Sequence, residues 1–492
     1  MSTFYDLIFD KKKDWDKELL ITNIGRYSLH DLHSKVDEWM NILRSEGELK
    51  GKKVAALIPN LADYFSLLLA VNKLGGTFIP LSHQYRNDDL TKVLNLTRPN
   101  IVFTIKEQNK IQFKDMVTDW AKTNYIQTTL FSYNNGVFEK EHIQGNEESL
   151  ITEQIDLIVC TSGSTGVPKG IKYKVNSLEL WTKAIVSGVE LWQTDRIFLT
   201  IPITAVYGIS WILTCLIHRI QMVIAEKFDV PIVINLLNDF PCNKMATTPS
   251  LFKAIYLFAK QISPISLNSF QLVVLAGELI SDEFKALMKD FRGCRLINNY
   301  GLSEVGTLMY AKDDIRSKVV EGWSISDGVE YKVNSFSDDG IGELMIKSLM
   351  GFDGYYLNDE LTREVLTTDG WFYTGDLVRI NDLGHIEIIG RKKQLIKKGG
   401  VQVIPGEVEQ VLNQHPKVLQ SAVVGIPHSV YGEEVVAFII SEDDLNLDDL
   451  FSFVRERIAN FKVPGKIIRI NEMPITQGKL DRVTLRKIAM DS

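Results

Sequence analysis

The sequence contains few cysteines, and their positions exclude the usual cysteine-based sites. Its 492 residues include only four, and no two of them form a CxxC pair. A structural zinc site is therefore not expected, and the pattern is typical of buried, reduced thiols in a cytosolic protein. The four are Cys160, Cys215, Cys242 and Cys294.

The chain also lacks an excess of positive charge and a long apolar run. Its net charge is −7 and its pI is about 5.8, which argues against a dedicated nucleic-acid-binding protein. The longest apolar stretch, residues 207–217, is too short to span a bilayer. Charged residues at positions 10–14 stand where a signal peptide would be apolar. We expect a soluble, cytoplasmic protein without an integral membrane segment.

The arrangement of the apolar residues predicts an α/β fold. At 45% hydrophobic, a chain of this length can build several domains. Residues 54–58 have the pattern of a strand, residues 61–74 that of a helix ending at Gly75, and residues 78–81 that of the next strand. The alternation recurs around residues 101–104 and 272–275. It predicts parallel-rich sheets layered with helices.

The organisation changes in the last third of the chain. Residues 328–389 contain short strand patterns separated by Gly, Asp and Asn turns, which predict a β-rich subdomain. A cluster of charged residues interrupts the pattern at 390–394. The remainder has an α+β pattern of its own and a length typical of a domain. We therefore predict a large N-terminal domain, residues 1–389, and a small mobile C-terminal domain, residues 390–492.

The segment 161–170, TSGSTGVPKG, is the most informative in the chain. It follows an apolar strand pattern at 157–160. Gly163 and Gly166 can adopt positive φ and let backbone N–H groups converge on an anion, and Lys169 adds a mobile charge. Gly170 follows the lysine where a Walker loop has a Mg²⁺-binding hydroxyl, so the spacing differs from that motif. The segment predicts a phosphate-binding loop, and a polar turn between two strands is the plain alternative.

Later segments contain residues suited to other parts of a nucleotide. In NNYGLSE, residues 298–304, Tyr300 could stack on a purine and Glu304 could hold Mg²⁺. In YTGD, residues 373–376, Asp376 could bind ribose hydroxyls, and Arg391 could reach the same sugar. Lys479 follows a glycine near the C-terminus. Taken alone, the 298–304 segment is equally consistent with a strand-end turn and a solvated glutamate, whereas Asp376, Arg391 and Lys479 are better explained as ordinary turn or surface residues.

Together, in this order, the segments resemble the adenylate-forming superfamily, which comprises acyl- and aryl-CoA synthetases, adenylation domains of peptide synthetases and beetle luciferases. The resemblance extends over most of the chain. The matching segments are residues 161–170, 298–304, 342–356, 373–376, 390–409 and 477–482.

The resemblance implies a nucleotide site for ATP with Mg²⁺. Glu304 corresponds to the residue that supports Mg²⁺, Asp376 to the ribose-binding aspartate, and Arg391 to its companion. The phosphate loop would comprise Thr161, Ser162, Gly163, Ser164, Thr165, Gly166 and Lys169, with Thr165 also catalytic. The adenine pocket and the motif beside it would comprise Ala276, Gly277, Glu278, Asn298, Asn299, Tyr300, Gly301 and Ser303.

The resemblance also implies that the small domain moves between two reaction steps. Lys479 corresponds to the lysine that reaches the substrate carboxylate and the α-phosphate while the acyl-AMP forms. Lys393 occupies the hinge position. Lys397 and Gln402 resemble a residue pair that serves the adenylate-forming pose in one branch of CoA ligases. The glycines at 399–400 suit close passage of a pantetheine arm.

The chain departs from the family pattern in the segment that would line the acid pocket. Ala205 stands where many relatives have a histidine, and Tyr207 could take part of that function. No aspartate lies between residues 201 and 211 to balance a buried ammonium, so we expect a fatty or aryl acid with an uncharged tail. The predicted pocket residues are Tyr207, Gly208, Thr248, Leu251, Leu302 and Thr307, although core packing explains Tyr207 and Leu251 equally well.

The thiol acceptor is left open by the sequence. The segment 475–482 is closer to peptide-synthetase adenylation domains, whereas the loop 396–400 is closer to acyl-CoA synthetases. The first hypothesis is an AMP-forming ligase that transfers the acid to coenzyme A. The alternative is a free-standing adenylation enzyme that loads the phosphopantetheine of an acyl carrier protein. No residue pattern supports a luciferase-like oxygenase. No nucleic-acid partner is expected.

Overall fold

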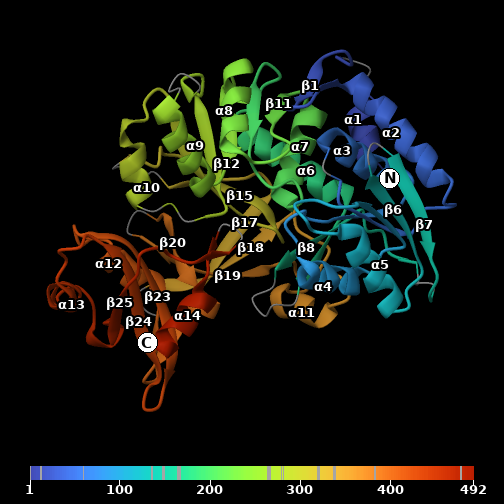
Figure 1. Cartoon of the computed structure of the whole chain (residues 1–492). Coiled ribbons are helices and arrows are strands. Elements are labelled where there is room, and N and C mark those ends of the chain that lie inside the picture. The colour runs from blue at the N-terminus through green and yellow to red at the C-terminus, as the bar shows by residue number, and fades with distance from the viewer. Residues whose placement is uncertain are drawn as a thin grey trace.

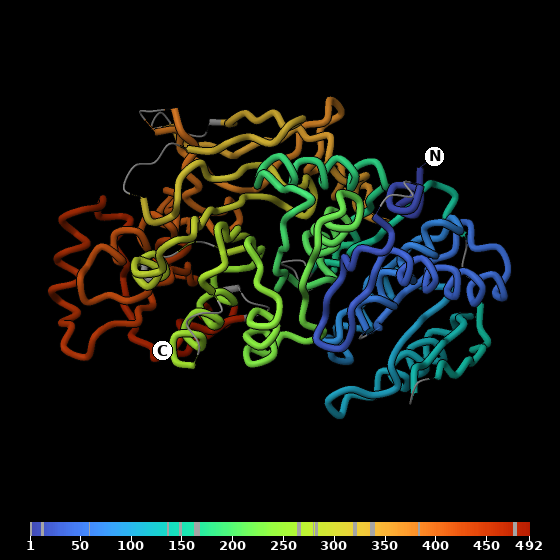
Figure 2. Tube along the Cα trace, turned by 90° about the horizontal axis from the view of Figure 1, so that it is seen from above, coloured from blue at the N-terminus to red at the C-terminus, as the bar shows by residue number. Residues whose placement is uncertain are grey.

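The protein has a mixed α/β fold with a large N-terminal and a small C-terminal domain (Figure 1). The computed structural model describes residues 2–10, 14–58, 60–134, 137–146, 150–162, 168–262, 267–278, 280, 282–317, 322–335, 340–381, 384–476 and 479–492. Seen from above, the N-terminal and C-terminal thirds of the chain lie at opposite ends of the molecule (Figure 2).

One sheet of the large domain has seven strands in the order β7-β6-β5-β3-β4-β8-β9. Its central strands are parallel, and the edge pairs β6–β7 and β8–β9 are antiparallel. The strands expected near residues 54–58, 78–81 and 101–104 are confirmed. The strands are β3 (Lys53–Ala56), β4 (Thr77–Pro80), β5 (Ile101–Ile105), β6 (Thr128–Asn134), β7 (Val137–Ile143), β8 (Leu157–Ser162) and β9 (Pro168–Tyr173).

Helices cover both faces of this sheet because its strands are apolar on both sides. In β3 and directly after it, Val54 and Ala56 belong to one core cluster, whereas Ala55 and Leu57 belong to another. Helices α2 and α3 pack into the first cluster, and α4 and α5 into the second. The helices are α2 (Leu29–Arg44), α3 (Leu61–Lys73), α4 (Asn87–Thr97) and α5 (Phe113–Thr123).

The helix expected at 61–74 is confirmed, and its ends follow from local chemistry. The Asn60 side chain accepts a hydrogen bond from the backbone of Asp63 at 3.0 Å and caps the first turn. The helix ends where Gly75 takes a positive φ of 78°, a conformation that suits glycine.

A second sheet has nine strands in the order β16-β15-β14-β13-β12-β10-β11-β1-β2. The strands from β14 to β1 are parallel, so their carboxyl ends meet at one edge, where open α/β sheets bind ligands. The strands are β1 (Glu18–Ile21), β2 (Arg26–Ser28), β10 (Arg196–Leu199), β11 (Gln221–Ile224), β12 (Lys244–Thr247), β13 (Leu272–Ala276), β14 (Arg295–Leu302), β15 (Gly306–Ala311) and β16 (Trp323–Ile325). The accompanying helices are α1 (Phe4–Phe9), α6 (Val175–Gly188), α7 (Val206–His218), α8 (Val230–Asp239), α9 (Pro249–Ile262), α10 (Asp282–Leu287) and the 3₁₀ turn η2 (Met288–Asp290).

A third, antiparallel sheet occupies the stretch in which the sequence predicted short strands. The buried carboxylate of Glu343, in β18, accepts a hydrogen bond from the Gly375 backbone at 3.1 Å and pairs with Lys392 at 2.7 Å. The sheet is thereby tied to the start of the following segment. Its elements are β17 (Val329–Ser335), β18 (Ile341–Ser348), α11 (Asp359–Val365), β19 (Phe372–Ile380) and β20 (Ile386–Arg391).

The C-terminal domain has a five-stranded sheet and core clusters of its own. Figure 1 shows α14 on the side that faces the large domain. The elements are η3 (Lys392–Gln394), β21 (Ile396–Lys398), β22 (Val401–Val403), α12 (Pro405–Leu412), β23 (Val418–His428), β24 (Gly432–Ser441), α13 (Leu447–Arg455), η4 (Asn460–Lys462), β25 (Lys466–Arg469), β26 (Ile475–Thr476), β27 (Lys479–Leu480) and α14 (Arg482–Asp491).

The cysteines are free, as expected. Cys215, Cys242 and Cys294 are buried, and Cys160 is half-buried. Burial raises the pKa of the Cys160 thiol to about 12, which keeps it protonated at neutral pH. A membrane-crossing helix, one both long enough and apolar enough, is not found anywhere in the described ranges.

Candidate functional site

The predicted ribose residues form a buried, charged cluster. Asp376 in β19 lies directly opposite Arg391 in β20, and the Arg391 Nε is 2.5 Å from Asp376 Oδ1. The Tyr300 hydroxyl, at the end of β14, donates to Asp376 Oδ2 at 2.6 Å. Asp376 is only 2% exposed. Two donors therefore hold the carboxylate in place, and its remaining lone pairs can accept hydrogen bonds from a pair of sugar hydroxyls.

Burial and neighbouring charge act in opposite directions on this cluster. Burial raises the pKa of the Asp376 carboxyl, while Arg391 and Tyr300 oppose the rise. Burial also raises the pKa of the Tyr300 hydroxyl well above its usual value, so Tyr300 remains a donor. Its ring faces are not used by the hydrogen bond, so the predicted stacking on a purine is compatible with this contact.

Glu304 is joined to the phosphate-loop hairpin by two tyrosines. The Tyr355 hydroxyl donates to Glu304 Oε1 at 2.9 Å, and the Tyr173 hydroxyl, from β9, donates to the Ser303 carbonyl. The Lys169 ammonium lies 5.0 Å from the centre of the Tyr355 ring, within cation–π range. The predicted phosphate lysine and the predicted magnesium ligand thus both contact Tyr355, one at its ring and the other at its hydroxyl.

The environment of Glu304 suits a hard cation. Tyr355 engages only Oε1, and within the described ranges it is the sole hydrogen-bond partner of the carboxylate. Burial and Glu304 raise the pKa of the Tyr355 phenol, which keeps it a neutral donor. A half-buried carboxylate oxygen next to a phosphate-binding segment is a ligand that Mg²⁺ prefers.

The ends of the phosphate loop belong to two antiparallel strands. Thr161 lies opposite Lys169, and Ser162 opposite Pro168, so the two ends of the segment pair with each other. Gly170 accepts a hydrogen bond from the Tyr356 backbone at 2.7 Å, which joins the hairpin to the segment after β18. Part of the predicted loop lies outside the described residues: Gly163, Ser164, Thr165, Gly166 and the side chain of Ser162.

The predicted adenine residues lie at the carboxyl ends of β13 and β14. Ala276 is opposite Asn299, and Gly277 has a positive φ of 84° with no atom within 4 Å of where a Cβ would be. The Glu278 carboxylate accepts hydrogen bonds from the backbone and hydroxyl of Ser250, at 3.0 and 2.6 Å. Glu278 therefore ties β13 to the start of α9 and leaves open space beside Gly277.

The two neighbouring asparagines differ in what they can contribute. Asn299 is 4% exposed, and its side-chain amide donates to the Met309 carbonyl at 3.0 Å, so one of its two N–H donors is already used. Asn298 is half-buried and points to the opposite side of the strand. Gly301 pairs with Thr307 in a tight turn.

The predicted acid-pocket residues fall into two groups. Thr248 directly precedes α9 and Leu251 lies in its first turn, and the Thr248 hydroxyl accepts from the Leu251 backbone at 3.3 Å. Tyr207 and Gly208 begin α7, and Thr307 and Leu302 belong to the β14–β15 hairpin. A Cβ on Gly208 would lie 2.2 Å from the Pro202 carbonyl, so only glycine allows this close approach. The Thr307 hydroxyl is buried and accepts from Trp181 Nε1 at 2.8 Å.

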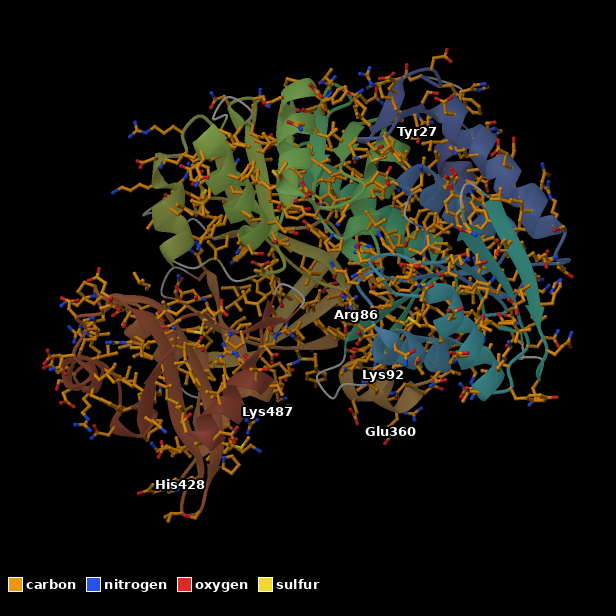
Figure 3. The ribbon with its side chains drawn as sticks, viewed as in Figure 1. Tyr27, Arg86, Lys92, Glu360, His428 and Lys487 are labelled. Carbon is orange, nitrogen blue, oxygen red and sulfur yellow. The ribbon has the colours of Figure 1, made fainter. Side chains whose placement is uncertain are left out.

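Lys397 and Gln402 are brought together, on the small domain. They face each other across the β21–β22 hairpin, and both are exposed. Lys398 pairs with Gly432 at the turn of the long β23–β24 hairpin. Figure 3 shows His428, at the same turn, at the end of the small domain that points away from the large one.

The predicted hinge residue, Lys393, and the predicted adenylation lysine, Lys479, lie near the two ends of the small domain in sequence. Lys393 is exposed in the 3₁₀ turn η3, directly after β20, and its charge acts on the pKa of Asp376. Lys479 pairs through its backbone with Thr476 in the short β26–β27 hairpin. The Lys479 side chain lies outside the described residues.

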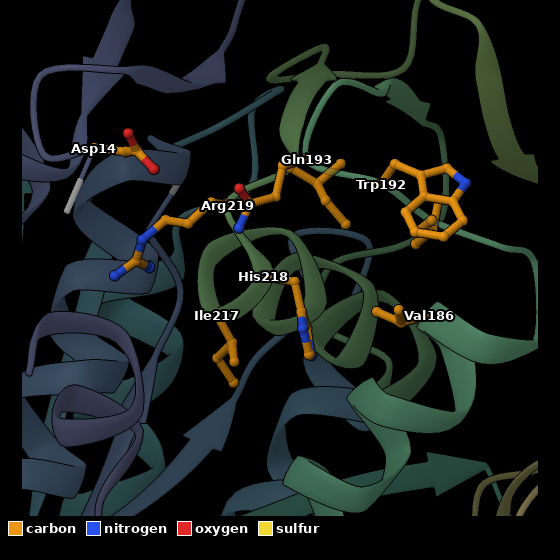
Figure 4. Close-up of a pocket in the computed structure, with 9 residues that line it drawn as sticks. Asp14, Val186, Trp192, Gln193, Ile217, His218 and Arg219 are labelled. Atoms are coloured by element: carbon orange, nitrogen blue, oxygen red, sulfur yellow. The ribbon is translucent and has the colours of Figure 1, made fainter. Parts of the chain in front are cut away.

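A pocket of about 240 Å³ lies elsewhere, at the C-terminal end of α7. Figure 4 shows Arg219, His218 and Trp192 around it. The Arg219 guanidinium donates to the carbonyls of Leu216 and Ile8, so its charge holds α1 and α7 together. None of the predicted site residues lines this pocket.

The sequence analysis assigned no role to Tyr355 and Tyr173, which connect the site. Tyr355 belongs to a segment that contributes to the resemblance. The sequence around a tyrosine does not indicate which carboxylate its hydroxyl will contact. The contact joins positions 51 residues apart and depends on how the third sheet packs on the second.

The chain is similar in sequence and in fold to known enzymes. The model of the AMP-binding enzyme family matches residues 10–356, and that of the AMP-binding enzyme C-terminal domain matches residues 407–479. The medium-chain fatty-acid–CoA ligase of Escherichia coli K12 is 26% identical over 502 residues, covering 96% of this chain and 88% of its own. Luciferin 4-monooxygenase of Nipponoluciola cruciata is 26% identical over 473 residues, covering 91% and 86%. The crystal structure of ATP-bound MatB from Rhodopseudomonas palustris has the same fold, with a TM-score of 0.85 at 22% identity and 99% of each chain covered.

Proposed function

Because the chain belongs to the AMP-binding enzyme family, we propose that it joins a carboxylic acid to ATP as an acyl-AMP, and then transfers the acyl group to a thiol. Coenzyme A is the proposed acceptor, with AMP and pyrophosphate as the other products. The observation that carries the proposal is the cluster of Asp376, Arg391 and Tyr300 next to Glu304, Tyr355 and Lys169.

The first step needs positive charge, because a carboxylate must approach a polyanionic nucleotide. Lys169 would hold the β- and γ-phosphates, and Lys479 would reach the substrate carboxylate and the α-phosphate. Asp376 would fix the ribose, and so the position of the α-phosphate relative to the acid. A magnesium ion held by Glu304 would supply further neutralisation at the phosphates.

The second step needs a different arrangement of the small domain. An acyl-AMP is readily hydrolysed, so water must be excluded until the thiol arrives. We propose that residues 390–492 form the mobile domain and that it turns at Lys393. The loop at 397–400 would then approach the acyl-AMP, and its glycines would let a pantetheine arm pass.

Coenzyme A is favoured over a carrier protein by two observations. The loop at 396–400 is the part of the chain most similar to acyl-CoA synthetases, and several relatives are named CoA ligases. The test is incubation with an acid, ATP and coenzyme A, followed by mass spectrometry. Acyl-CoA, AMP and pyrophosphate are the expected products. An acyl-AMP that accumulates in the presence of coenzyme A would favour the carrier protein instead, and release of ADP and phosphate would contradict both.

Tyr355→Phe should weaken the use of Mg²⁺. The change removes a hydrogen bond of 2.9 Å to Glu304 while leaving the ring beside Lys169. A hydrogen bond to a charged group contributes about 1.5–3 kcal/mol, and partial exposure places this one near the lower end. We expect about a tenfold increase in the Mg²⁺ concentration that gives half-maximal adenylation. Tyr431→Phe, at an exposed tyrosine of the small domain, is the control. An unchanged Mg²⁺ dependence would remove Tyr355 from the site.

Lys393→Pro should slow the thiol step more than adenylation. Proline restricts φ, and a hinge residue must change its backbone angles as the domain turns. We expect the rate of acyl transfer to coenzyme A to fall about tenfold more than the rate of pyrophosphate exchange. Lys393→Ala removes the same charge but keeps the backbone free, so it should affect both steps little. Equal loss of both steps in the proline variant would exclude this hinge.

A further inference from the structure

Three buried polar atoms beside the predicted acid pocket have no hydrogen-bond partner in the described chain: Tyr207 Oη, Tyr310 Oη and Trp211 Nε1. Tyr310 is 2% exposed and Trp211 is fully buried. Buried polar atoms in folded proteins are nearly always paired, so a group of three without partners needs an occupant.

The three atoms belong to one cluster. Tyr207 and Trp211 are one turn apart on α7, with ring centres 6.2 Å from each other. The Trp211 indole is near enough to the Tyr207 hydroxyl to oppose the rise in its pKa, but neither atom has a partner at hydrogen-bond geometry in the described chain. Tyr310, on β15, is close enough to Tyr207 that ionisation of Tyr207 would raise its pKa. Thr307, whose hydroxyl accepts from Trp181, lies next to the Tyr310 hydroxyl and opposes the rise in its pKa, but the two hydroxyls are not at hydrogen-bond geometry.

The surroundings hold these residues in place and limit the space. A Cβ on Gly188 would lie 2.0 Å from the Tyr310 ring, so the ring is packed directly on the α6 backbone. Behind Gly306, the side chains of Met350 and Trp181 fill the interior, 2.9 and 3.5 Å from where a Cβ would be. Tyr207 itself is only half-buried although its hydroxyl is covered, so the accessible part of this residue is its ring.

The chemistry of the cluster favours a neutral oxygen. Burial raises the pKa of Tyr207 and of Tyr310, so both keep their protons, and with the indole N–H they offer three donors. No lysine or arginine of the described chain acts on either phenol. A second carboxylate would therefore be buried without a counter-charge.

We propose that the acid substrate is compact and carries a hydroxyl or carbonyl oxygen on its tail, which Tyr207, Tyr310 and Trp211 bind at the closed end of the pocket. This inference rests on the proposed function. It replaces the broad expectation of a fatty or aryl acid with one class, because a long saturated chain would leave all three donors unpaired against bulky aromatic walls.

The test compares pairs of acids of similar shape with and without the oxygen, using ATP–pyrophosphate exchange by the whole protein. The pairs are 4-hydroxybutanoate with pentanoate, 4-oxopentanoate with 4-methylpentanoate, and 3-hydroxybenzoate with 3-methylbenzoate, and decanoate and succinate are added. We expect at least one oxygenated acid to exceed its partner by about tenfold or more in kcat/KM, since a site built for a polar group rejects an analogue that lacks it. Decanoate and succinate should be poor substrates.

Variants assign the preference to the cluster. Tyr310→Phe and Tyr207→Phe should each reduce the ratio within the preferred pair to about twofold, without changing the KM for ATP. Tyr64→Phe is the matched control, since Tyr64 is also a buried tyrosine whose hydroxyl has no partner in the described chain. It should leave the ratio unchanged, and thermal unfolding checks that each variant is folded.

The outcomes separate this inference from the proposed function. Exchange that is equal or faster with the methyl partners, or fastest with decanoate, would overturn the inference and leave the ligase activity intact. The three atoms would then be satisfied by buried water. A ratio that survives both tyrosine changes would also overturn it. Absence of exchange with every acid would overturn the proposed function itself.

Discussion

Lys479→Ala should abolish acyl-AMP formation and spare the thiol step. Only the first step gathers negative charge between the acid and the α-phosphate, so only that step needs the ammonium. Removal of one preorganised group of this kind costs about 10²–10³ in rate, and a full charge places the expected loss at the upper end. The measurement is ATP–pyrophosphate exchange for the first step and acyl-CoA formation from synthetic acyl-AMP for the second.

The control for this prediction is Lys487→Ala. Lys487 is an exposed lysine on α14, a few residues further along the same domain, and Figure 3 shows its side chain. Lys487→Ala removes the same charge from the domain as Lys479→Ala does. A general electrostatic effect on nucleotide binding would therefore appear in both variants. Equal loss of both steps in Lys479→Ala would refute the assigned role, as would equal effects of the two lysine changes on exchange.

Asp376→Ala should weaken ATP binding by about 1.5–3 kcal/mol, or about 10- to 150-fold in Kd, if its carboxylate binds the ribose hydroxyls. The carboxylate also holds Arg391 and Tyr300, so its loss leaves a guanidinium without its partner at 2.5 Å. The measurement is the affinity for ATP and for AMP by calorimetry. AMP should lose about the same free energy as ATP, because both have the ribose.

Two further variants separate the ribose contact from general damage. Asp376→Asn keeps the shape and removes the charge, so it should fall between the wild type and the alanine variant. Asp444→Ala removes an exposed aspartate that pairs with Lys417 at 2.6 Å, and it should leave nucleotide affinity unchanged. An unaltered affinity for both nucleotides in Asp376→Ala would exclude the ribose role.

The sequence predicted the fold class and the position of most strands and helices because these depend on local patterns. The helix at 61–74 is an example, since its apolar spacing, its Asn60 cap and its Gly75 end all lie within one short segment. The opposition of Lys397 and Gln402 needs only a tight turn at Gly399 and Gly400, and so a short hairpin is sufficient to create it. The site residues remain predictions from resemblance, and the geometry shows which of them lie together.

Sequence patterns did not predict the contacts between distant segments. The Asn299 amide, predicted to lie beside the nucleotide, donates to the Met309 carbonyl, a contact set by the β14–β15 register. Tyr355 reaches Glu304, and Tyr300 reaches Asp376, only because two sheets pack against each other. No periodicity in the chain encodes which tyrosine meets which carboxylate.

The sequence by itself determined that this protein has an AMP-binding enzyme's segments in order. It could do so because a phosphate loop or a strand-end carboxylate is specified by neighbouring residues. Only the tertiary structure decided that Tyr207, Trp211 and Tyr310 share one buried cluster, since α7 and β15 are brought together by long-range packing. Burial removes water from the donors, and a buried donor without a partner is unfavourable. This burial results from the packing of distant segments and not from any single segment.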